Sequence, residues 1–196
     1  MKMNDLVGKT ETIEFKLNGD KISAFEGETI IQAAARHGVD IPHLCYKEGY
    51  RPDGNCRACM VEIKGERVLA PSCCRAPAQG MEVQSNNARA LASQKMVVEL
   101  LMNDVTVSED LKPGANELTY WADKLGVKKG RFPAREGWKQ DVSHPAMDVN
   151  LDACIQCTRC VRACREEQVN DVIGYAFRGL DSKIVFDMDD PMGEST

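Results

Sequence analysis

The stretch HLCYKEGYRPDGNCRACMVEIKGERVLAPSCC, residues 43–74, decides how the first part of this chain folds. Its cysteines follow the spacing Cys45-x10-Cys56-x2-Cys59-x13-Cys73, and Cys74 comes directly after the last of them. Three of these thiols lie on one short segment, and thiolates at such density bind soft metals. The spacing therefore predicts a metal centre built on a loop.

The residues around this stretch have the order of a small sheet covered by one helix. Asn18-Gly19 is a strong hairpin signal, and a helix is expected between Thr29 and Gly38. Strand, strand, helix, cysteine loop, strand, strand is the order of a β-grasp ferredoxin domain, which we assign to residues 1–83 of an α+β protein. The expected strands are Thr10–Leu17, Lys21–Phe25, Met60–Ile63, Arg67–Ala70 and Gly80–Val83.

Two kinds of metal centre fit the first cysteine set. A 2Fe–2S cluster needs four thiolates, whereas Cys-x2-Cys with distant cysteines also occurs in structural zinc sites. The β-grasp order favours the 2Fe–2S cluster, with Cys45, Cys56 and Cys59 as three of its ligands. Either Cys73 or Cys74 is the fourth. We favour Cys73 and expect Cys74 to be a buried small hydrophobe.

A second cysteine set lies in LDACIQCTRCVRACREE, residues 151–167, with the spacing Cys154-x2-Cys157-x2-Cys160-x3-Cys164. This run is typical of a 4Fe–4S cluster. In two-cluster ferredoxins the fourth cysteine binds the other cluster, so Cys164 serves either this cluster or a second one. On a helix, Cys160 and Cys164 would lie one turn apart. We expect a bacterial-ferredoxin-like 4Fe–4S half domain over residues 144–196, incomplete at its C-terminus if the chain is a fragment of a longer subunit.

Three arginines, Arg159, Arg162 and Arg165, stand among these cysteines. They either offset the negative charge of a cluster, face a partner, or form a solvated helix face. After them, Ile173–Arg178 and Lys183–Asp187 alternate as a hairpin would. Between the two cysteine sets, residues 84–143 read as a helical connector, with helices over residues 87–102 and Asn116–Leu125.

Composition narrows the class of protein. The formal charge of −5 and the pI near 5.3 argue against nucleic acid as a partner, since binding it needs a basic surface. No segment approaches the roughly 18 apolar residues of a membrane span, and the first residues lack the apolar core of an export signal. Nine cysteines in such a chain favour metal ligation in the reducing cytoplasm, where we expect the protein.

The segments IPHLCY, GNCRACMVEI and the CC…GMEV stretch, all within residues 41–83, carry a resemblance to a known family. They resemble the N-terminal ferredoxin domain of the complex I iron–sulfur subunit, of NAD-reducing and iron-only hydrogenases, and of NAD-dependent formate dehydrogenases. In that family the fourth cysteine lies seven residues before the glycine matching Gly80, which supports Cys73. DACIQCTRCVRACREEQVNDVIGYAFRG, residues 152–179, most closely resembles the formate dehydrogenase alpha subunit.

The resemblance implies electron transfer through 2Fe–2S and 4Fe–4S clusters in a multi-subunit oxidoreductase. A formate dehydrogenase would place the chain between a molybdopterin catalytic domain or subunit and a flavin/NAD-binding diaphorase subunit. Family members often carry a third cluster held by one histidine and three cysteines, but residues 103–127 contain neither residue type, so we expect none here.

Other functions fit the same residues. The chain could serve an NAD-linked hydrogenase, be a free-standing ferredoxin, or be a structural zinc-binding interaction module. It has no Gly-rich dinucleotide motif and no pterin domain, so we expect no catalytic site in this chain alone.

Overall fold

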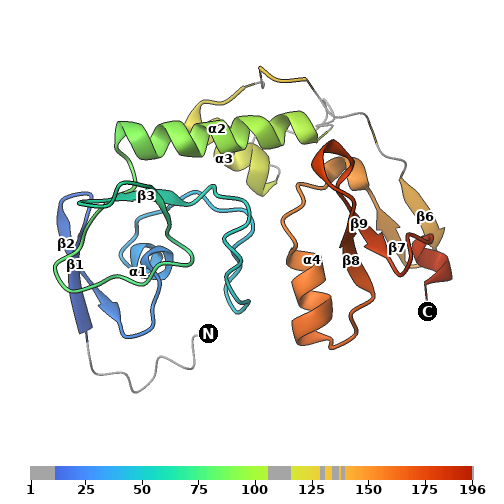
Figure 1. The fold of residues 1–196 in the computed structure, drawn as a ribbon, viewed down its shortest axis with the longest axis horizontal. Coiled ribbons are helices and arrows are strands. Elements are labelled where there is room, and N and C mark those ends of the chain that lie inside the picture. Colours follow the sequence, from blue (N-terminus) through green and yellow to red (C-terminus); the bar gives the residue numbers. More distant parts are fainter. Residues whose placement is uncertain (1–11, 106–115, 129–130, 134–136, 138–139, 196) are drawn as a thin grey trace.

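In the computed structural model, two lobes are joined by a pair of helices (Figure 1). The structure describes residues 12–105, 116–128, 131–133, 137 and 140–195. One lobe carries the first cysteine set and the other carries the second. Within the described ranges, no helix is both long enough and apolar enough to cross a bilayer.

The first lobe is a five-stranded mixed sheet with one helix packed on it. Its strand order is β2-β1-β5-β3-β4. The β1–β5 pair is parallel and the other neighbours are antiparallel. Asn18 and Gly19 both have positive φ in the turn between the first two strands, as a tight hairpin requires. The elements are β1 (Thr12–Leu17), β2 (Asp20–Phe25), α1 (Ile30–Arg36), β3 (Met60–Ile63), β4 (Ala70–Pro71) and β5 (Glu82–Gln84).

Two strands of this lobe differ from the sequence-based expectation. β4 is only Ala70–Pro71, because the residues before it form the turn after β3 and Pro71 has no N–H for further pairing. β5 begins at Glu82 instead of Gly80, since Gly80 has positive φ and belongs to the preceding turn. The first two residues of the expected strand Thr10–Leu17 lie outside the described residues.

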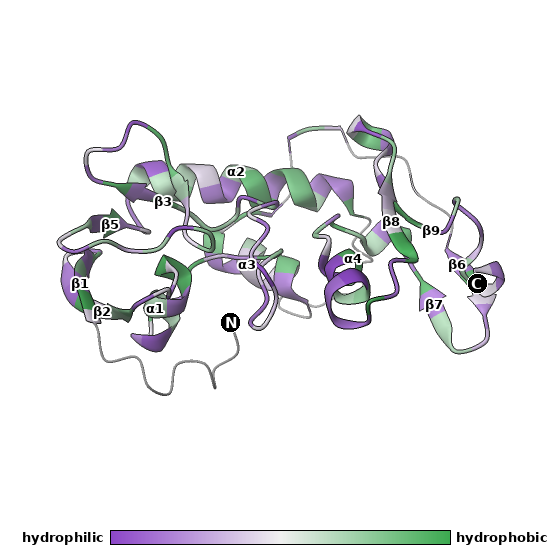
Figure 2. Cartoon of the chain, turned by 60° about the horizontal axis from the view of Figure 1, so that its bottom comes forward, coloured by the Kyte–Doolittle hydropathy of each residue, from purple (hydrophilic) through white to green (hydrophobic). Residues whose placement is uncertain are grey.

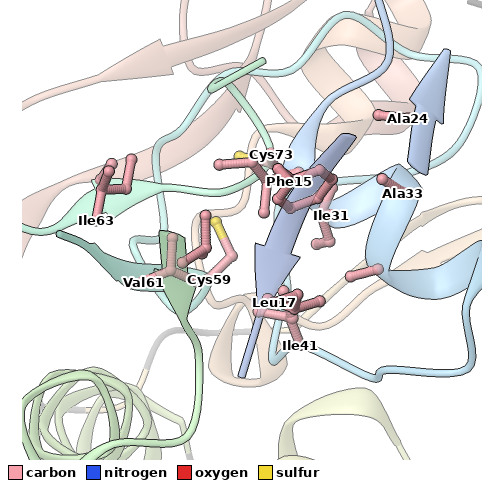
Figure 3. Packing of buried hydrophobic residues seen from close by; sticks show 14 of the residues in the cluster. Phe15, Leu17, Ala24, Ile31, Ala33, Ile41, Cys59, Val61, Ile63 and Cys73 are labelled. Carbon is pink, nitrogen blue, oxygen red and sulfur yellow. The ribbon is translucent and has the colours of Figure 1, made fainter. Parts of the chain in front are cut away.

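The core of this lobe lies between the sheet and α1, and it includes two cysteines of the first set. Figure 3 shows Cys59 and Cys73 among the side chains of Phe15 and Val61. Cys73 is fully buried and Cys59 is nearly so. Burying a large aliphatic or aromatic side chain stabilises a fold by about 1.5–3 kcal/mol, so this core anchors the cysteine loop at two points.

The connector helices are α2 (Ala88–Asp104) and α3 (Glu117–Leu125). The side chains of Asn87 and Asn116 cap their first turns, and Gly126 ends α3 in a left-handed conformation. Both predicted helices are confirmed. Figure 2 shows apolar and polar residues alternating along α2. A second apolar cluster joins these helices to Leu44 and Ala58 of the cysteine loop.

The second lobe contains two small hairpins around the second cysteine set. The hairpin predicted after the cysteines is confirmed, in antiparallel register from Ile173↔Phe186 to Ala176↔Lys183. The hairpin before them was not predicted, and its first strand runs across the expected boundary at residue 144. The elements are β6 (Asp141–His144), β7 (Met147–Val149), η2 (Leu151–Ala153), α4 (Arg159–Arg162), η3 (Ala163–Glu167), β8 (Ile173–Ala176), η4 (Gly179–Asp181), β9 (Lys183–Phe186) and η5 (Met192–Glu194).

Candidate metal centres

The first candidate centre contains Cys45, Cys56, Cys59 and Cys73, which the structure places as two pairs of thiols. Cys45 and Cys56 are hydrogen-bonded neighbours, as are Cys59 and Cys73. Cys45 also contributes to raising the pKa of Cys59, so the two pairs lie near each other. Cys45, Cys59 and Cys73 are buried and Cys56 is half-buried.

Backbone N–H groups are directed at the sulfur atoms of this centre. The N–H of Cys45 donates to Sγ of Cys56 at 3.4 Å, and the N–H of Cys56 returns a bond to Sγ of Cys45 at 3.4 Å. The N–H of Ala58 donates to Sγ of Cys56 at 3.5 Å. Such donors stabilise negative charge on sulfur. The loop is therefore arranged to hold thiolates.

The pKa values of these thiols also indicate that the site favours thiolates. The thiol of Cys45 and then the backbone N–H groups lower the pKa of Cys56 to about 6. The thiol of Cys73 is the first cause that lowers the pKa of Cys59 to about 7. The pKa of the other thiol in each pair changes in the opposite direction. For Cys45, the hydrogen bond to Cys56 and then burial raise the pKa. One member of each pair is thus readily ionised near neutral pH.

Cys74 does not have the environment expected of it. The sequence predicted a buried small hydrophobe, but Cys74 is exposed. Its Sγ lies 3.5 Å from that of Cys73, and it also faces Gly54, where an added Cβ would lie 2.9 Å from this sulfur. The prediction failed because Cys73 turns into the core between sheet and helix, which directs the next residue outward.

The second candidate centre contains Cys154, Cys157 and Cys160. The charges of Cys157 and Cys154 act on Cys160 and, after desolvation, raise its pKa. The N–H of Gln156 donates to Sγ of Cys154 at 3.4 Å. Gln156 and Thr158, on either side of Cys157, both have positive φ. Cys154 and Cys157 thus both lie close enough to Cys160 to affect its thiol.

A cavity of about 520 Å³ opens beside Cys154 and Cys160. Apolar side chains from the second hairpin, among them Ile184 and Phe186, form part of its wall, together with residues of β7. A cavity lined by two thiols and several apolar side chains could hold a soft, poorly hydrated group.

Cys164 is separated from the other three by a change of helix type. It is buried, and it lies in the π-helical turn η3 that follows α4. Cys160 precedes that turn and is exposed. The expected regular helix joining the two is therefore interrupted, and a π turn of this kind is frequent at functional sites. Whether Cys164 completes this centre stays a prediction.

The two centres are joined by polar contacts that sequence reasoning missed. Asp53 accepts a hydrogen bond from the hydroxyl of Thr158 at 2.9 Å, and the side chain of Asn55 donates to the carbonyl of Gln156 at 3.0 Å. These residues lie roughly a hundred positions apart in the chain, so no local pattern could identify them.

Across the described ranges, no three His, Cys, Asp or Glu side chains are placed to hold a single metal ion.

Comparison with known proteins finds a family model that matches the part of the chain containing the first centre. Residues 10–88 match the family described as "2Fe-2S iron-sulfur cluster binding domain". The match contains Cys45, Cys56, Cys59 and Cys73 together with Cys74.

Similarity to curated proteins extends over most of the chain. The NADP-reducing hydrogenase subunit HndD of Solidesulfovibrio fructosivorans is 33% identical over 84% of this chain, which covers 29% of that protein. The mitochondrial NADH-ubiquinone oxidoreductase 78 kDa subunit of Candida albicans is 32% identical over 88% of this chain and is covered over 25% of its length. The corresponding 78 kDa subunit of Neurospora crassa is 33% identical over 88% of this chain and is covered over 24% of its length. The chain thus spans less than a third of these relatives.

A solved structure has the same fold. It is a chain of an NAD+-reducing [NiFe]-hydrogenase, crystallised in the H2-reduced state, with a TM-score of 0.84 and 26% identity. The likeness covers 93% of this chain and 79% of the other. The chain therefore contains a 2Fe–2S domain related to the complex I 78 kDa subunit and to subunits of NAD(P)-linked hydrogenases.

Proposed function

We propose that this chain transfers electrons through a 2Fe–2S cluster and a 4Fe–4S cluster within a multi-subunit, NAD-linked oxidoreductase. The observation that carries the proposal is the first centre, where backbone N–H groups of the cysteine loop are directed at the sulfur atoms of Cys45 and Cys56. The match of residues 10–88 to a 2Fe–2S domain supports it. The oxidoreductase setting is supported by the relatives, which are named as subunits of a hydrogenase and of NADH-ubiquinone oxidoreductases.

The residues proposed to hold the 2Fe–2S cluster are Cys45, Cys56, Cys59 and Cys73. When bound, the cluster supplies a reversible one-electron redox centre. The chain supplies the rest. The core around Cys59 and Cys73 keeps water away from sulfur, and the N–H groups of the loop stabilise negative charge there. Each of these effects changes the reduction potential.

For the 4Fe–4S cluster we propose Cys154, Cys157 and Cys160, with Cys164 as the fourth ligand or as a ligand of a neighbouring cluster. The cavity beside Cys154 and Cys160 supports this assignment. The apolar wall contributed by Ile184 and Phe186 would limit the access of water and so affect the potential.

The experiment for the cofactors is anaerobic purification followed by analysis of iron, sulfide and zinc, with absorption and EPR spectra. We expect brown protein that contains iron and acid-labile sulfide. Cys56→Ser should remove or strongly alter the reduced-state signal of the 2Fe–2S cluster. Cys154→Ser should remove only the signal of the 4Fe–4S cluster. Colourless protein containing zinc would instead support the structural zinc-binding alternative.

We propose formate dehydrogenase as the specific enzyme, with a molybdopterin catalytic unit and a flavin/NAD-binding diaphorase subunit as partners in the cytoplasm. Residues 152–179 support this choice through their resemblance to formate dehydrogenase alpha subunits. The test is purification of a tagged chain from its native host, with identification of the copurifying subunits and assays of formate and hydrogen oxidation. Hydrogenase subunits with hydrogen oxidation would replace this proposal. Recovery of the chain alone would favour a free-standing ferredoxin.

A further inference from the structure

Arg162 stands two residues after Cys160 and two residues before Cys164, yet its side chain is buried against the loop of the first centre. Only 4% of the residue is exposed. Of the alternatives open for these arginines, the solvated helix face is therefore wrong at this position. A buried charge is costly unless hydrogen bonds and a counter-charge compensate it, so its contacts indicate the role of the residue.

The contacts of Arg162 are made mainly to the main chain of the first loop. Nη2 donates to the carbonyl oxygen of Cys45 at 2.5 Å, and Nη1 donates to that of Arg51 at 2.6 Å. The carboxylate of Asp53 lies 3.7 Å from Nε. These acceptors all lie between the ligands Cys45 and Cys56 or at Cys45 itself. Arg162 therefore holds the path of the loop that carries the first centre.

Arg159 makes the matching contact one turn earlier on α4. Its Nη2 donates to the carbonyl of Tyr46 at 2.8 Å, and its Nη1 pairs with Glu117 of α3 at 2.5 Å. Two consecutive carbonyls of the first loop, those of Cys45 and Tyr46, are thus held by two arginines of the second lobe. The planar, multi-donor guanidinium suits such paired acceptors in a way that lysine does not. We call Arg159 and Arg162 the arginine clamp.

We propose that the arginine clamp is a positioning device that sets the separation between the two cluster sites, with Arg162 as its buried member. This proposal rests on the proposed function, since it assumes both clusters. Cys160 and Cys164 are each two residues from Arg162, and the guanidinium bonds the backbone of Cys45 directly. A displacement of α4 would therefore move ligands of the second centre relative to the first.

Two variants separate geometry from charge. Arg162→Lys keeps a positive charge but cannot hold both carbonyls, whereas Arg162→Met removes charge and hydrogen bonds together. In protein loaded with both clusters and fully reduced, we expect both variants to weaken the magnetic interaction between the clusters in EPR. Only Arg162→Met should also change the reduction potential of the 2Fe–2S cluster, because it alone removes a buried charge near that cluster.

The matched control is Arg165→Met, on the same segment. Arg165 is exposed and pairs with Asp171 of its own lobe. Arg165→Met removes the same charge as Arg162→Met and should leave the magnetic interaction between the clusters unchanged. If both clusters load and Arg162→Met shows the wild-type interaction, the positioning role is refuted while the proposed function stands. If the wild-type chain binds neither cluster, the proposed function fails first.

Hydrogen exchange on the chain without clusters tests the clamp independently. Removing two hydrogen bonds to a charged group should raise the exchange rate of amides in residues 45–55 by about tenfold or more in Arg162→Met. The amides of β1 and β2 should keep their wild-type rates, which would show that the fold survives. Unchanged exchange in residues 45–55 would overturn the clamp, even in protein that holds no cluster.

Discussion

Neighbouring residues of the first centre have different environments, and the difference suggests different roles. Cys73 is fully buried, bonded to Cys59 and packed in the core, whereas Cys74 is exposed beside Gly54. A ligand must present its sulfur to the other three thiols. Cys73 is bonded to Cys59, whereas the sulfur contact of Cys74 is with Cys73 itself. The structure therefore favours the same fourth ligand as the family resemblance.

We predict that Cys73→Ser removes or strongly alters the reduced-state EPR signal of the 2Fe–2S cluster, whereas Cys74→Ser leaves it unchanged. The physical reason is the position of Cys73 beside Cys59 in the core. Absorption spectra of the anaerobically purified variants provide a second measurement. The reverse pattern, with loss in Cys74→Ser alone, would show that the ligand assignment is wrong.

Gly54 is required for two reasons that can be measured separately. Its φ of +62° is in the left-handed region, and an added Cβ would lie 2.9 Å from Sγ of Cys74. We predict that Gly54→Ala lowers the free energy of unfolding of the chain without clusters by more than the backbone cost alone, which is about 1–2 kcal/mol. Urea denaturation gives the value.

Two further variants serve as controls for this prediction. Gly126→Ala has a similar φ of +68° with no atom within 4 Å of the added Cβ, so it should show the backbone cost only. The double variant Gly54→Ala, Cys74→Ala removes the close contact and should recover the excess. Equal losses in Gly54→Ala and Gly126→Ala would mean that the contact with Cys74 has no effect.

At the scale of elements, α2 packs differently from its sequence pattern. Two of its large apolar residues, Met96 and Leu100, are exposed. The buried residues of the helix are Ala90, Gln94 and Val98. Gln94 donates to the carbonyls of Met60 and Ser85, each at 3.0 Å. A polar side chain thus ties the helix to the first residue of β3, directly after Cys59, and to the residue that follows β5.

We predict that Gln94→Ala lowers the free energy of unfolding by about 1–3 kcal/mol, because it leaves buried carbonyl groups without a donor. The matched control is Lys95→Ala, at the next and exposed position, which should change the value by less than about 0.5 kcal/mol. Urea denaturation followed by circular dichroism measures both. A loss in Gln94→Ala no larger than that of the control would show that these hydrogen bonds do not stabilise the protein.

At the scale of the whole molecule, the two centres lie in separate lobes whose ligands come from distant parts of the chain. The connector between them holds α2 and α3, and it packs against the first loop through Leu44 and Ala58. The contacts between the lobes include polar ones made by the arginine clamp, Asp53 and Asn55. The relative placement of the centres therefore depends on polar contacts between the lobes.

We predict that fully reconstituted chain contains about six iron atoms, two from one cluster and four from the other. The reason is that residues 103–127, where relatives often carry a further cluster, contain no histidine and no cysteine. Quantitation of iron and acid-labile sulfide per chain is the measurement. A reproducible value near ten, by the same counting, would reveal a third cluster.

The amino-acid sequence determined the local features of this protein. Cysteine spacing identifies which thiols can share a centre, since ligands close in sequence must lie close in space. Asn18-Gly19 predicts the first hairpin and the caps Asn87 and Asn116 suit the starts of the helices, because turns and helix ends depend on a few neighbouring residues. The hairpin and the two helices were confirmed to within a few residues.

Only the tertiary structure decided which side chains face which environment. The exposure of Cys74, the burial of Gln94 and the contact of Arg162 with Cys45 each depend on segments far apart in the chain. Sequence periodicity cannot identify such residues, because an arginine or glutamine in a polar segment is expected to be solvated. The distant carbonyl group that binds it cannot be found from the local sequence. Long-range hydrogen bonds between the lobes depend on how the lobes pack against each other, and this packing depends on the fold of the whole chain.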